Sequence, residues 1–148
     1  MSKPPPLTIE PLGESDVESV VTLWQRCGLT RPWNDPHADI ALARRGAHST
    51  ILVGRRNGGV ISSVMVGHDG HRGWLYYLAV DPDAQRQRYG AAMTVAAEDW
   101  LRLRGVNKAM LMVRTDNVDV RAFYDALGYG AQERIVFAKW LDGRDATP

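Results

Sequence analysis

The residues with the clearest chemical potential follow an apolar segment at Trp74–Val80. Asp81-Pro82 ends that segment, the polar stretch Gln85-Arg-Gln-Arg-Tyr-Gly90 follows, and an amphipathic helical pattern begins at once. The start of a helix presents free N–H groups and the positive end of the helix dipole to whatever lies at the end of the preceding strand. Arg86 and Arg88 carry side chains that suit phosphate recognition. This stretch therefore predicts an anion site.

A second polar stretch, Arg114–Tyr129, lies one helix and one strand further along the chain. From the residues alone, Asn117 can cap a helix and Gly128 can end it in a left-handed conformation. Because both polar stretches follow apolar runs with strand character, they are expected at the carboxyl ends of strands, where ligands of mixed α/β sheets bind. We expect the two stretches to converge.

Together, the two stretches resemble the signatures of the GCN5-related N-acetyltransferase (GNAT) superfamily of acyl-CoA-dependent acyltransferases. Gln85 and Gly90 fit its pyrophosphate loop, [Q/R]-x-x-G-x-[G/A], whereas Arg88 stands where the pattern has its central glycine. The second stretch fits the pattern N-x-x-A-x-x-x-Y-x-x-x-G-[F/Y], with Val120 replacing the alanine. Its matching residues are Asn117, Tyr124, Gly128 and Tyr129.

This resemblance implies acetyl transfer from acetyl-CoA to an amine by direct attack, without a covalent enzyme intermediate. Tyr124 would lie near the thioester sulfur and protonate the leaving thiolate. The main chain of residues 78–80 would pair with the pantetheine arm like an added strand, and Asn117 would hydrogen-bond that arm. The CoA-binding residues implied by the resemblance are Leu78, Ala79, Val80, Gln85, Arg86, Gln87, Arg88, Tyr89, Gly90, Ala91, Asn117 and Tyr124.

Arg88 leaves two alternatives open. A glycine in a phosphate loop lets the backbone approach the ligand closely, so a side chain there can crowd the pyrophosphate. If residue 88 instead has helical dihedrals, its N–H still points at the phosphate and the guanidinium adds a charge-assisted contact. We expect binding to be retained. The alternative function is a non-catalytic acyl-CoA-binding or regulatory module with a degenerate pyrophosphate loop.

The segments Arg31-Pro-Trp-Asn-Asp-Pro36 and Gly67-His-Asp-Gly-His-Arg-Gly73 resemble a subgroup of small bacterial acetyltransferases. The first lies where the superfamily covers its acceptor. The acceptor residues that follow from this resemblance are Trp33, Asn34, Asp35, His71 and Tyr76. The alternative is a proline-bounded loop with Trp33 packed inward and Asp35 capping a helix.

A general base is not evident where superfamily members often carry a glutamate. Those positions hold Tyr76, Tyr77 and Met112. An alkylammonium group has a pKa of about 10.4 and must lose its proton before it attacks. His71 and Asp69 are candidates for that role, although each also suits a turn. No metal is expected, because His68 and His71 have no further ligand cluster beside them.

Composition narrows the remaining function classes. The chain has 148 residues, of which 45% are hydrophobic and 24% charged, as in an ordinary globular domain. With 18 Lys+Arg against 17 Asp+Glu, the formal net charge is +1, which gives no reason to expect nucleic acid or a membrane as partner. The partner expected is a small-molecule or peptide amine. Cys27 is the only cysteine, so a reducing cytoplasm is the expected compartment.

The hydrophobic patterns predict the order β-α-α-β-β-β-α-β-α-β. A capping box at Ser15 and Glu18 starts the first helix, Asp35-Pro36 starts the second, and Asn57-Gly58 forms a hairpin turn. Ala109–Val113 reads as a central strand. The expected elements are strands at 7–12, 50–54, 60–66, 74–80, 109–113 and 135–141, and helices at 16–27, 36–45, 89–104 and 119–127.

This order predicts an α/β fold of the GNAT type, with a central mixed sheet flanked by about four helices. A single domain is expected over residues 1–148, with an extended leader at 1–6 and a polar tail at 142–148. An edge strand would offer a route to a homodimer. A Rossmann or P-loop nucleotide site lacks its glycine-rich fingerprint in this sequence.

Overall fold

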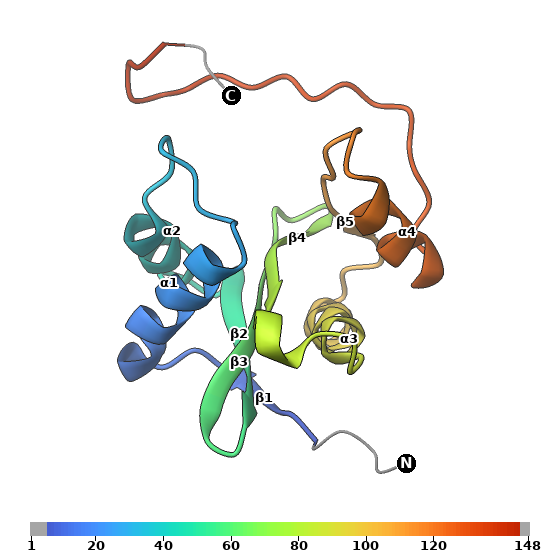
Figure 1. Ribbon diagram of the computed structural model, residues 1–148. Helices are drawn as coiled ribbons and strands as arrows, with labels where there is room; N and C mark the ends of the chain where they lie inside the picture. The colour runs from blue at the N-terminus through green and yellow to red at the C-terminus, as the bar shows by residue number, and fades with distance from the viewer. Residues whose placement is uncertain (1–5, 146–148) are drawn as a thin grey trace. The chain divides into compact units, whose positions relative to one another are not determined.

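The computed structural model describes residues 6–145, and the chain divides into two compact units, residues 1–112 and 113–148. Each unit is described by itself (Figure 1). Of the leader expected at residues 1–6, only residue 6 is described; of the tail expected at 142–148, residues 142–145 are described and contain no helix or strand. The single domain over 1–148 stays a prediction.

The first unit holds most of the regular structure. Its elements are β1 (Thr8–Pro11), a 3₁₀ turn (Glu14–Asp16), α1 (Val17–Arg26), α2 (Pro36–Ala43), β2 (Ser49–Arg56), β3 (Gly59–His68), β4 (Gly73–Val80), a second 3₁₀ turn (Pro82–Ala84), α3 (Tyr89–Arg102) and β5 (Ala109–Met110). The second unit contains α4 (Val118–Ala126).

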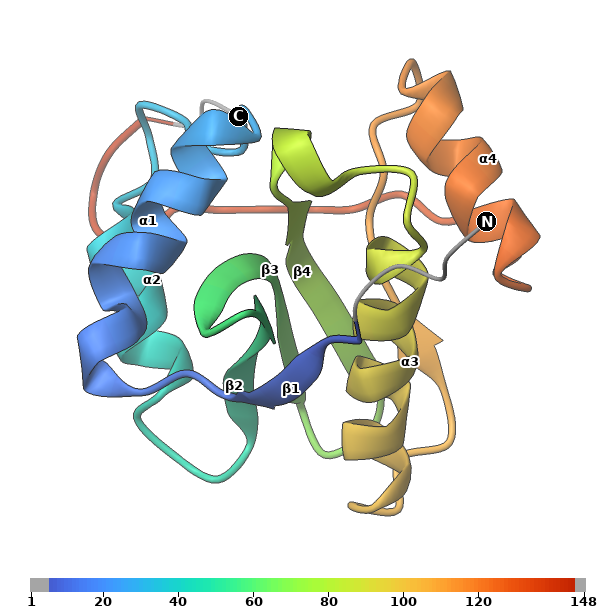
Figure 2. The ribbon, with the colours of Figure 1, turned by 60° about the horizontal axis from the view of Figure 1, so that its bottom comes forward.

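The five strands form one sheet in the order β1-β2-β3-β4-β5. The first four strands pair antiparallel, whereas β4 and β5 pair parallel through the crossover helix α3. Helices α1 and α2 lie on one face of the sheet and α3 lies on the other (Figure 2). This arrangement, with four α-helices over the described residues, confirms the predicted α/β mixed sheet.

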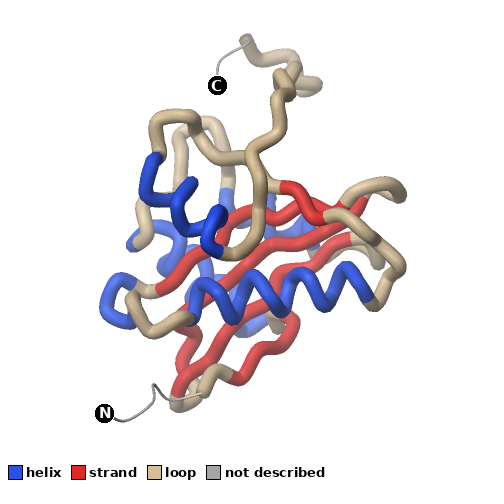
Figure 3. Tube along the Cα trace, turned by 90° about the vertical axis from the view of Figure 1, so that its right-hand side faces the viewer, coloured by secondary structure: helices blue, strands red, loops and turns tan. Residues whose placement is uncertain are grey.

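Alternation along β2 divides the core between the two faces of the sheet. Ile51 and Val53 are buried with α1 and α2, while Leu52 between them is buried with α3. Trp24 and Ile40 supply the helical side of the first layer. Figure 3 shows α3 lying along the strands of the sheet, where Met93 and its neighbours form the second layer.

Local signals in the sequence account for most of the element boundaries. The Asp35 carboxylate accepts hydrogen bonds from the N–H groups of His37 and Ala38, which confirms the predicted cap of α2. Asn57 and Gly58 have φ values of 52° and 83°, as a tight hairpin turn between β2 and β3 requires. The hairpin prediction is therefore confirmed.

Three local predictions are wrong. Ser15 does not cap the first helix, because Asp16 instead accepts the Gly13 N–H at 2.8 Å and holds Arg55. The strand expected at 109–113 has only two residues and lies at the edge, with β4 as its single neighbour. Residues 135–141 form no strand in the described chain. The second unit offers them only α4 as a regular element, and a strand needs another strand to pair with.

Candidate active site

The site is organised by a bulge in β4. Ser63 pairs with Ala79 and Met65 pairs with Tyr76, so Tyr77 and Leu78 face only Val64 on the neighbouring strand. Tyr77 has a φ of 52°, a left-handed conformation that costs a residue with a Cβ roughly 1–2 kcal/mol. The bulge interrupts the alternation of the strand, and both Tyr76 and Tyr77 line the same cavity.

Packing on the α1–α2 side holds the bulge in place. The Tyr77 ring stacks on Trp24 with centroids 3.8 Å apart, and its hydroxyl donates to the Asp39 carboxylate at 2.7 Å. The Trp24 indole donates to the Ser63 hydroxyl at 2.9 Å. Burial and the bond to Asp39 raise the pKa of Tyr77 above its ordinary range, so this phenol stays protonated. Tyr77 therefore holds the bulge in place through its hydrogen bond to Asp39, and it is a weak acid.

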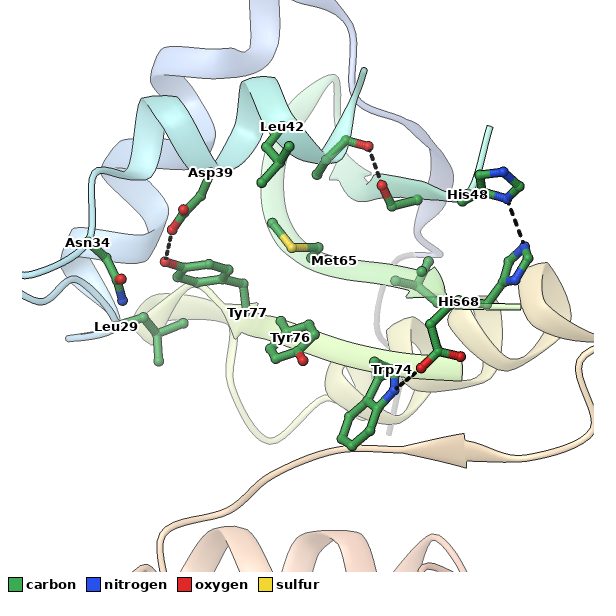
Figure 4. A pocket seen from close by; sticks show the side chains of 15 residues that line it. Leu29, Asn34, Asp39, Leu42, His48, Met65, His68, Trp74, Tyr76 and Tyr77 are labelled. Carbon is green, nitrogen blue, oxygen red and sulfur yellow. Dashed lines mark hydrogen bonds between the residues drawn. The ribbon is translucent and has the colours of Figure 1, made fainter. Parts of the chain in front are cut away.

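A cavity of about 640 Å³ opens on this side of the sheet (Figure 4). Toward one end Figure 4 places Leu29, Asn34, Asp39 and Tyr77, and toward the other His48, His68 and Trp74. Its lining residues are Leu29, Asn34, Asp39, Leu42, Ala43, His48, Ser49, Met65, Val66, Gly67, His68, Asp69, Trp74, Tyr76 and Tyr77. All of them belong to the first unit.

The structure brings two of the five predicted acceptor residues to this cavity. Asn34 and Tyr76 line it. Trp33, Asp35 and His71 are not among its lining residues. Asp35 serves as the cap of α2, and His71 lies in the turn before β4 with its N–H bonded to Asp69.

Of the two candidates for the general base, Asp69 lines the cavity and His71 does not. Hydrogen bonds from the backbone of Arg72 and His71 hold the pKa of the Asp69 carboxyl below the ordinary value. A carboxylate so stabilised is a weak base. The region also contains a histidine pair that the sequence did not reveal, because His48 and His68 are 20 residues apart and meet only across β2 and β3.

When His48 and His68 are both neutral, the nitrogen that can accept a proton is engaged in each ring. His68 Nδ1 accepts the Gly70 N–H at 3.1 Å, so in the neutral ring the proton is on Nε2. That nitrogen lies 3.4 Å from His48 Nδ1, which places the remaining proton of neutral His48 on its own Nε2. Both acceptor nitrogens are then engaged.

The polar loop lies at the other end of β4, and α1 fixes its entry. Arg26 at the end of α1 forms ion pairs with Asp81 and, at 3.2 Å, with Asp83. The 3₁₀ turn Pro82–Ala84 is thereby held against α1, and both carboxylates are paired with a cation. Two acidic groups beside a predicted anion site are compensated in this way.

Within the loop, Arg86 and Arg88 both have a φ of 64°. Arg88, with ψ of 18°, is the residue preceding α3 and is left-handed rather than helical. The central glycine of the resembling pattern would adopt this conformation without strain. Of the two alternatives for Arg88, the one that assumed helical dihedrals is therefore wrong. The arginine keeps the backbone path of a glycine.

The start of α3 has the features of an anion site. No side chain caps the helix, and its first turn contains no acidic residue. Arg56, at the end of β2, reaches the loop: its guanidinium lies 3.3 Å from the Gln87 side-chain oxygen and 5.8 Å from the centre of the Tyr89 ring. Arg56 is not among the CoA-binding residues that the resemblance implies. Three arginines therefore lie in or beside the loop: Arg56, Arg86 and Arg88.

The edge of β4 beside the loop is available along part of its length. On the β5 side, β4 pairs only at Gly73 and Trp74 over the described residues. Of the three predicted pantetheine contacts, the Val80 carbonyl already accepts from the Gln85 amide at 3.3 Å and the Cys27 thiol at 3.2 Å. Ala79 is already paired with Ser63 on β3, whereas Leu78 lies in the bulge and has no partner residue of its own in that ladder. Burial raises the pKa of the Cys27 thiol, which disfavours the reactive thiolate.

Asn117 and Tyr124 belong to the second unit. The Asn117 side chain accepts the Val120 N–H at 3.3 Å and so caps α4, the structural role that the sequence left open. Tyr124 packs edge-to-face against Phe123 and Tyr129, with ring centroids 4.9 and 5.6 Å away. Burial raises the pKa of Tyr124 to about 12.

Comparison with known proteins identifies the class of protein. The profile of the acetyltransferase (GNAT) family matches residues 17–129, which extend across both units. An acetyltransferase of Yersinia enterocolitica is 41% identical over 128 residues, covering 86% of this chain and 91% of that protein. An acetyltransferase of Pectobacterium atrosepticum is 43% identical over the same coverage.

Solved structures agree with this class. The ribosomal-protein-S18-alanine N-acetyltransferase of Escherichia coli is 29% identical with a TM-score of 0.74, covering 94% of this chain and 88% of that one. The acetyltransferase AAC(6')-Iy, solved with a CoA-linked bisubstrate analogue, superposes with a TM-score of 0.79 over 91% of this chain and 98% of its own. At 15% identity, it supports the fold alone. The chain belongs to the GNAT acetyltransferase family, and it transfers acetyl groups.

Two further observations bear on its surroundings. Over residues 6–145, no helix is long and apolar enough to cross a membrane. Within the same residues, no group of three or more His, Cys, Asp or Glu side chains is placed to hold a metal ion.

Proposed function

We propose that acetyl-CoA binds along the open edge of β4, with its pyrophosphate on the loop before α3, and that the acceptor amine enters the cavity beside the β4 bulge. The observation that carries this proposal is the bulge itself. It contains Leu78, a backbone position proposed for pantetheine, and Tyr77, which lines the cavity together with its neighbour Tyr76. The two substrates would then meet at one short segment of β4.

The residues fit the cosubstrate. An uncapped helix start without acidic residues provides N–H donors for the pyrophosphate, and the left-handed Arg88 keeps the path of a glycine. The proposed CoA contacts are the backbone of Leu78, Ala79 and residues 85–91, with the guanidinium groups of Arg56, Arg86 and Arg88. We leave Val80 out of the proposed pantetheine contacts, because its carbonyl already accepts from Gln85 and Cys27.

In the reaction, the amine nitrogen forms a bond with the acetyl carbon, the carbon–sulfur bond breaks, and CoA leaves as the thiolate. The ammonium group gives up one proton to water before the attack, and the nitrogen gives up a second proton to water after the new bond forms. We assign Tyr124 to the leaving sulfur on the strength of the family motif. With a pKa of about 12, its phenol lies about 3.5 pKa units above an ordinary thiol of about 8.5, so complete proton transfer would cost roughly 5 kcal/mol. Tyr124 would therefore act as a hydrogen-bond donor that keeps its proton.

The experiment is a comparison of Tyr124→Phe with wild type in a thiol-release assay. Loss of a donor that acts mainly as charge develops on sulfur should lower kcat by roughly tenfold to a hundredfold, with little change in KM for acetyl-CoA. Tyr129→Phe, a substitution in the same aromatic cluster, is the matched control and should leave kcat within about twofold. Equal effects of the two substitutions would contradict the assignment.

Asn117 caps α4, so its proposed bond to the pantetheine arm would have to come from its amide N–H₂, since the carbonyl oxygen is used by Val120. The partners proposed are small-molecule or peptide amines. A cytoplasmic location is proposed from the single cysteine, and a homodimer through an edge strand remains a prediction. The organisms of the matched relatives support a bacterial enzyme.

A further inference from the structure

The charges that line the cavity point to a particular class of acceptor. Among its described lining residues, two are aspartates, three carry large aromatic rings, and none is lysine or arginine. The aspartates are Asp39 and Asp69, and the aromatic residues are Trp74, Tyr76 and Tyr77. Carboxylates and electron-rich ring faces both attract cations. An acceptor with a negative group would find no ion-pair partner among lysines or arginines there.

The two carboxylates are held at separate places along β4. The Tyr77 hydroxyl donates to Asp39, and the Trp74 indole N–H donates to Asp69 at 3.3 Å. Trp74 and Tyr77 are three residues apart, which corresponds to roughly 10 Å along a strand. Figure 4 shows Tyr77 and Trp74 toward opposite ends of the cavity, with Tyr76 between them.

Three hydrogen bonds stabilise the ionised form of the Asp69 carboxyl group. Its Oδ1 accepts the N–H groups of His71 at 2.9 Å and Arg72 at 2.8 Å, while Oδ2 accepts the Trp74 indole. Hydrogen bonds of this kind favour the ionised carboxylate. The guanidinium of Arg72 donates to the His71 carbonyl and does not line the cavity. Among the lining residues, no lysine or arginine pairs with Asp69.

We infer that the acceptor is a compound with two amino groups, one of which reacts beside the bulge while the other, as an ammonium ion, binds Asp69. This inference rests on the proposed function of the cavity. The bulge end holds the reacting nitrogen, because the acetyl group is proposed to arrive at Leu78 and Ala79. The distal ammonium then lies near Asp69 and the faces of Trp74 and Tyr76, whose rings are stacked 6.5 Å apart.

Three acceptors of equal length test the inference, because they differ only in the charge of the far end. They are heptamethylenediamine, ω-aminoheptanol and ω-aminoheptanoate, each titrated calorimetrically into the protein saturated with CoA. We expect the diamine to bind at least tenfold more tightly than the amino alcohol, and the amino acid to bind most weakly. Equal binding of the diamine and the amino alcohol would overturn the inference.

Asp69→Asn removes the charge and keeps an oxygen that can accept from His71 and Arg72. It should reduce the preference for the diamine over the amino alcohol to about twofold. Trp74→Phe removes the indole hydrogen bond to Asp69 but leaves the charge and an aromatic face, so it should weaken the preference less than Asp69→Asn does. Asp99→Asn, on the exposed side of α3 where Asp99 pairs with Arg102, is the control outside the cavity and should change nothing. A preference that survives Asp69→Asn would overturn the inference.

Acetyl transfer is measured separately, with labelled acetyl-CoA and the same three compounds. Diamine selectivity in binding without transfer to any amine would support recognition of the distal ammonium by Asp69 and defeat the proposed function. Transfer to all three compounds with equal kcat/KM would support the function and defeat the inference. The two failures are therefore distinguishable.

Discussion

Replacing Arg88 with glycine separates the backbone role of this position from the role of its charge. A residue with a Cβ pays roughly 1–2 kcal/mol in the left-handed region, where Arg88 has a φ of 64°. Glycine pays nothing there but loses about 0.5–1 kcal/mol more backbone entropy on folding. The balance predicts that Arg88→Gly raises the free energy of unfolding by about 0.5–1 kcal/mol.

The same substitution should weaken CoA binding. If the Arg88 guanidinium bonds the pyrophosphate, its loss costs about 1.5–3 kcal/mol, which corresponds to roughly a tenfold to a hundredfold increase in Kd. Stability rises while affinity falls, so urea denaturation and calorimetric titration with CoA should move in opposite directions. The difference in Kd should shrink in high salt because the contact is ionic.

Two substitutions in the same loop serve as controls. Arg86→Gly shares the φ of 64° and should also stabilise the protein. Gln87 does not have a positive φ, so Gln87→Gly carries only the entropy cost and should destabilise by about 0.5–1 kcal/mol. If all three glycine variants lose stability alike, the reasoning from dihedral strain is refuted. If Arg88→Gly binds CoA as tightly as wild type, the contact with the pyrophosphate is refuted.

Further predictions concern the core and the β1–β2 edge. The Ser62 hydroxyl is fully buried and has no hydrogen-bond partner among the described residues, so Ser62→Ala should stabilise by about 1 kcal/mol in urea denaturation; a loss of stability would show that the hydroxyl is satisfied. The bond from Arg55 holds the pKa of Asp16 below its ordinary value of 3.8, so its contribution to stability is present above about pH 4 and is lost as the pH falls further. Asp16→Asn should therefore cost about 1.5–3 kcal/mol at pH 7 and much less near pH 3, and a cost independent of pH would argue against the ion pair. Tyr77→Phe should destabilise by about 1–2 kcal/mol through loss of the bond to Asp39, with the Trp24 stacking retained; an unchanged unfolding midpoint would show that the bulge does not depend on it.

The sequence predicted the elements that depend on local signals. The cap at Asp35, the turn at Asn57-Gly58 and the amphipathic pattern of α3 are set by a few neighbouring residues, and the structure confirms each. The early strands follow from short apolar runs on both sides of the turn, and the left-handed stop at Gly128 follows from a single glycine. In each case the interactions that stabilise the element are made between residues close together in the sequence.

Features that depend on contacts distant in sequence were missed. The sequence did not predict that the Asp16 carboxylate accepts the Gly13 N–H. The position of that carboxylate depends on its bond to Arg55, which is 39 residues away. The bulge at Tyr77 cannot be read from a strand pattern, since it is stabilised by Trp24 and Asp39 from two helices. The acceptor prediction favoured polar residues in two loops, whereas the cavity is lined mainly from α2, β2, β3 and β4. Pairing across strands, such as His48 with His68, leaves no trace in either segment alone.

The most direct test of the account is the fate of the acetyl group. Wild-type protein is incubated with acetyl-CoA labelled in the acetyl carbonyl and with heptamethylenediamine, and the products are separated by mass spectrometry. We expect the label on one nitrogen of the diamine, in an amount equal to the CoA thiol released. Label recovered only as free acetate, or CoA bound without release of thiol, would contradict acetyl transfer to an amine at this site.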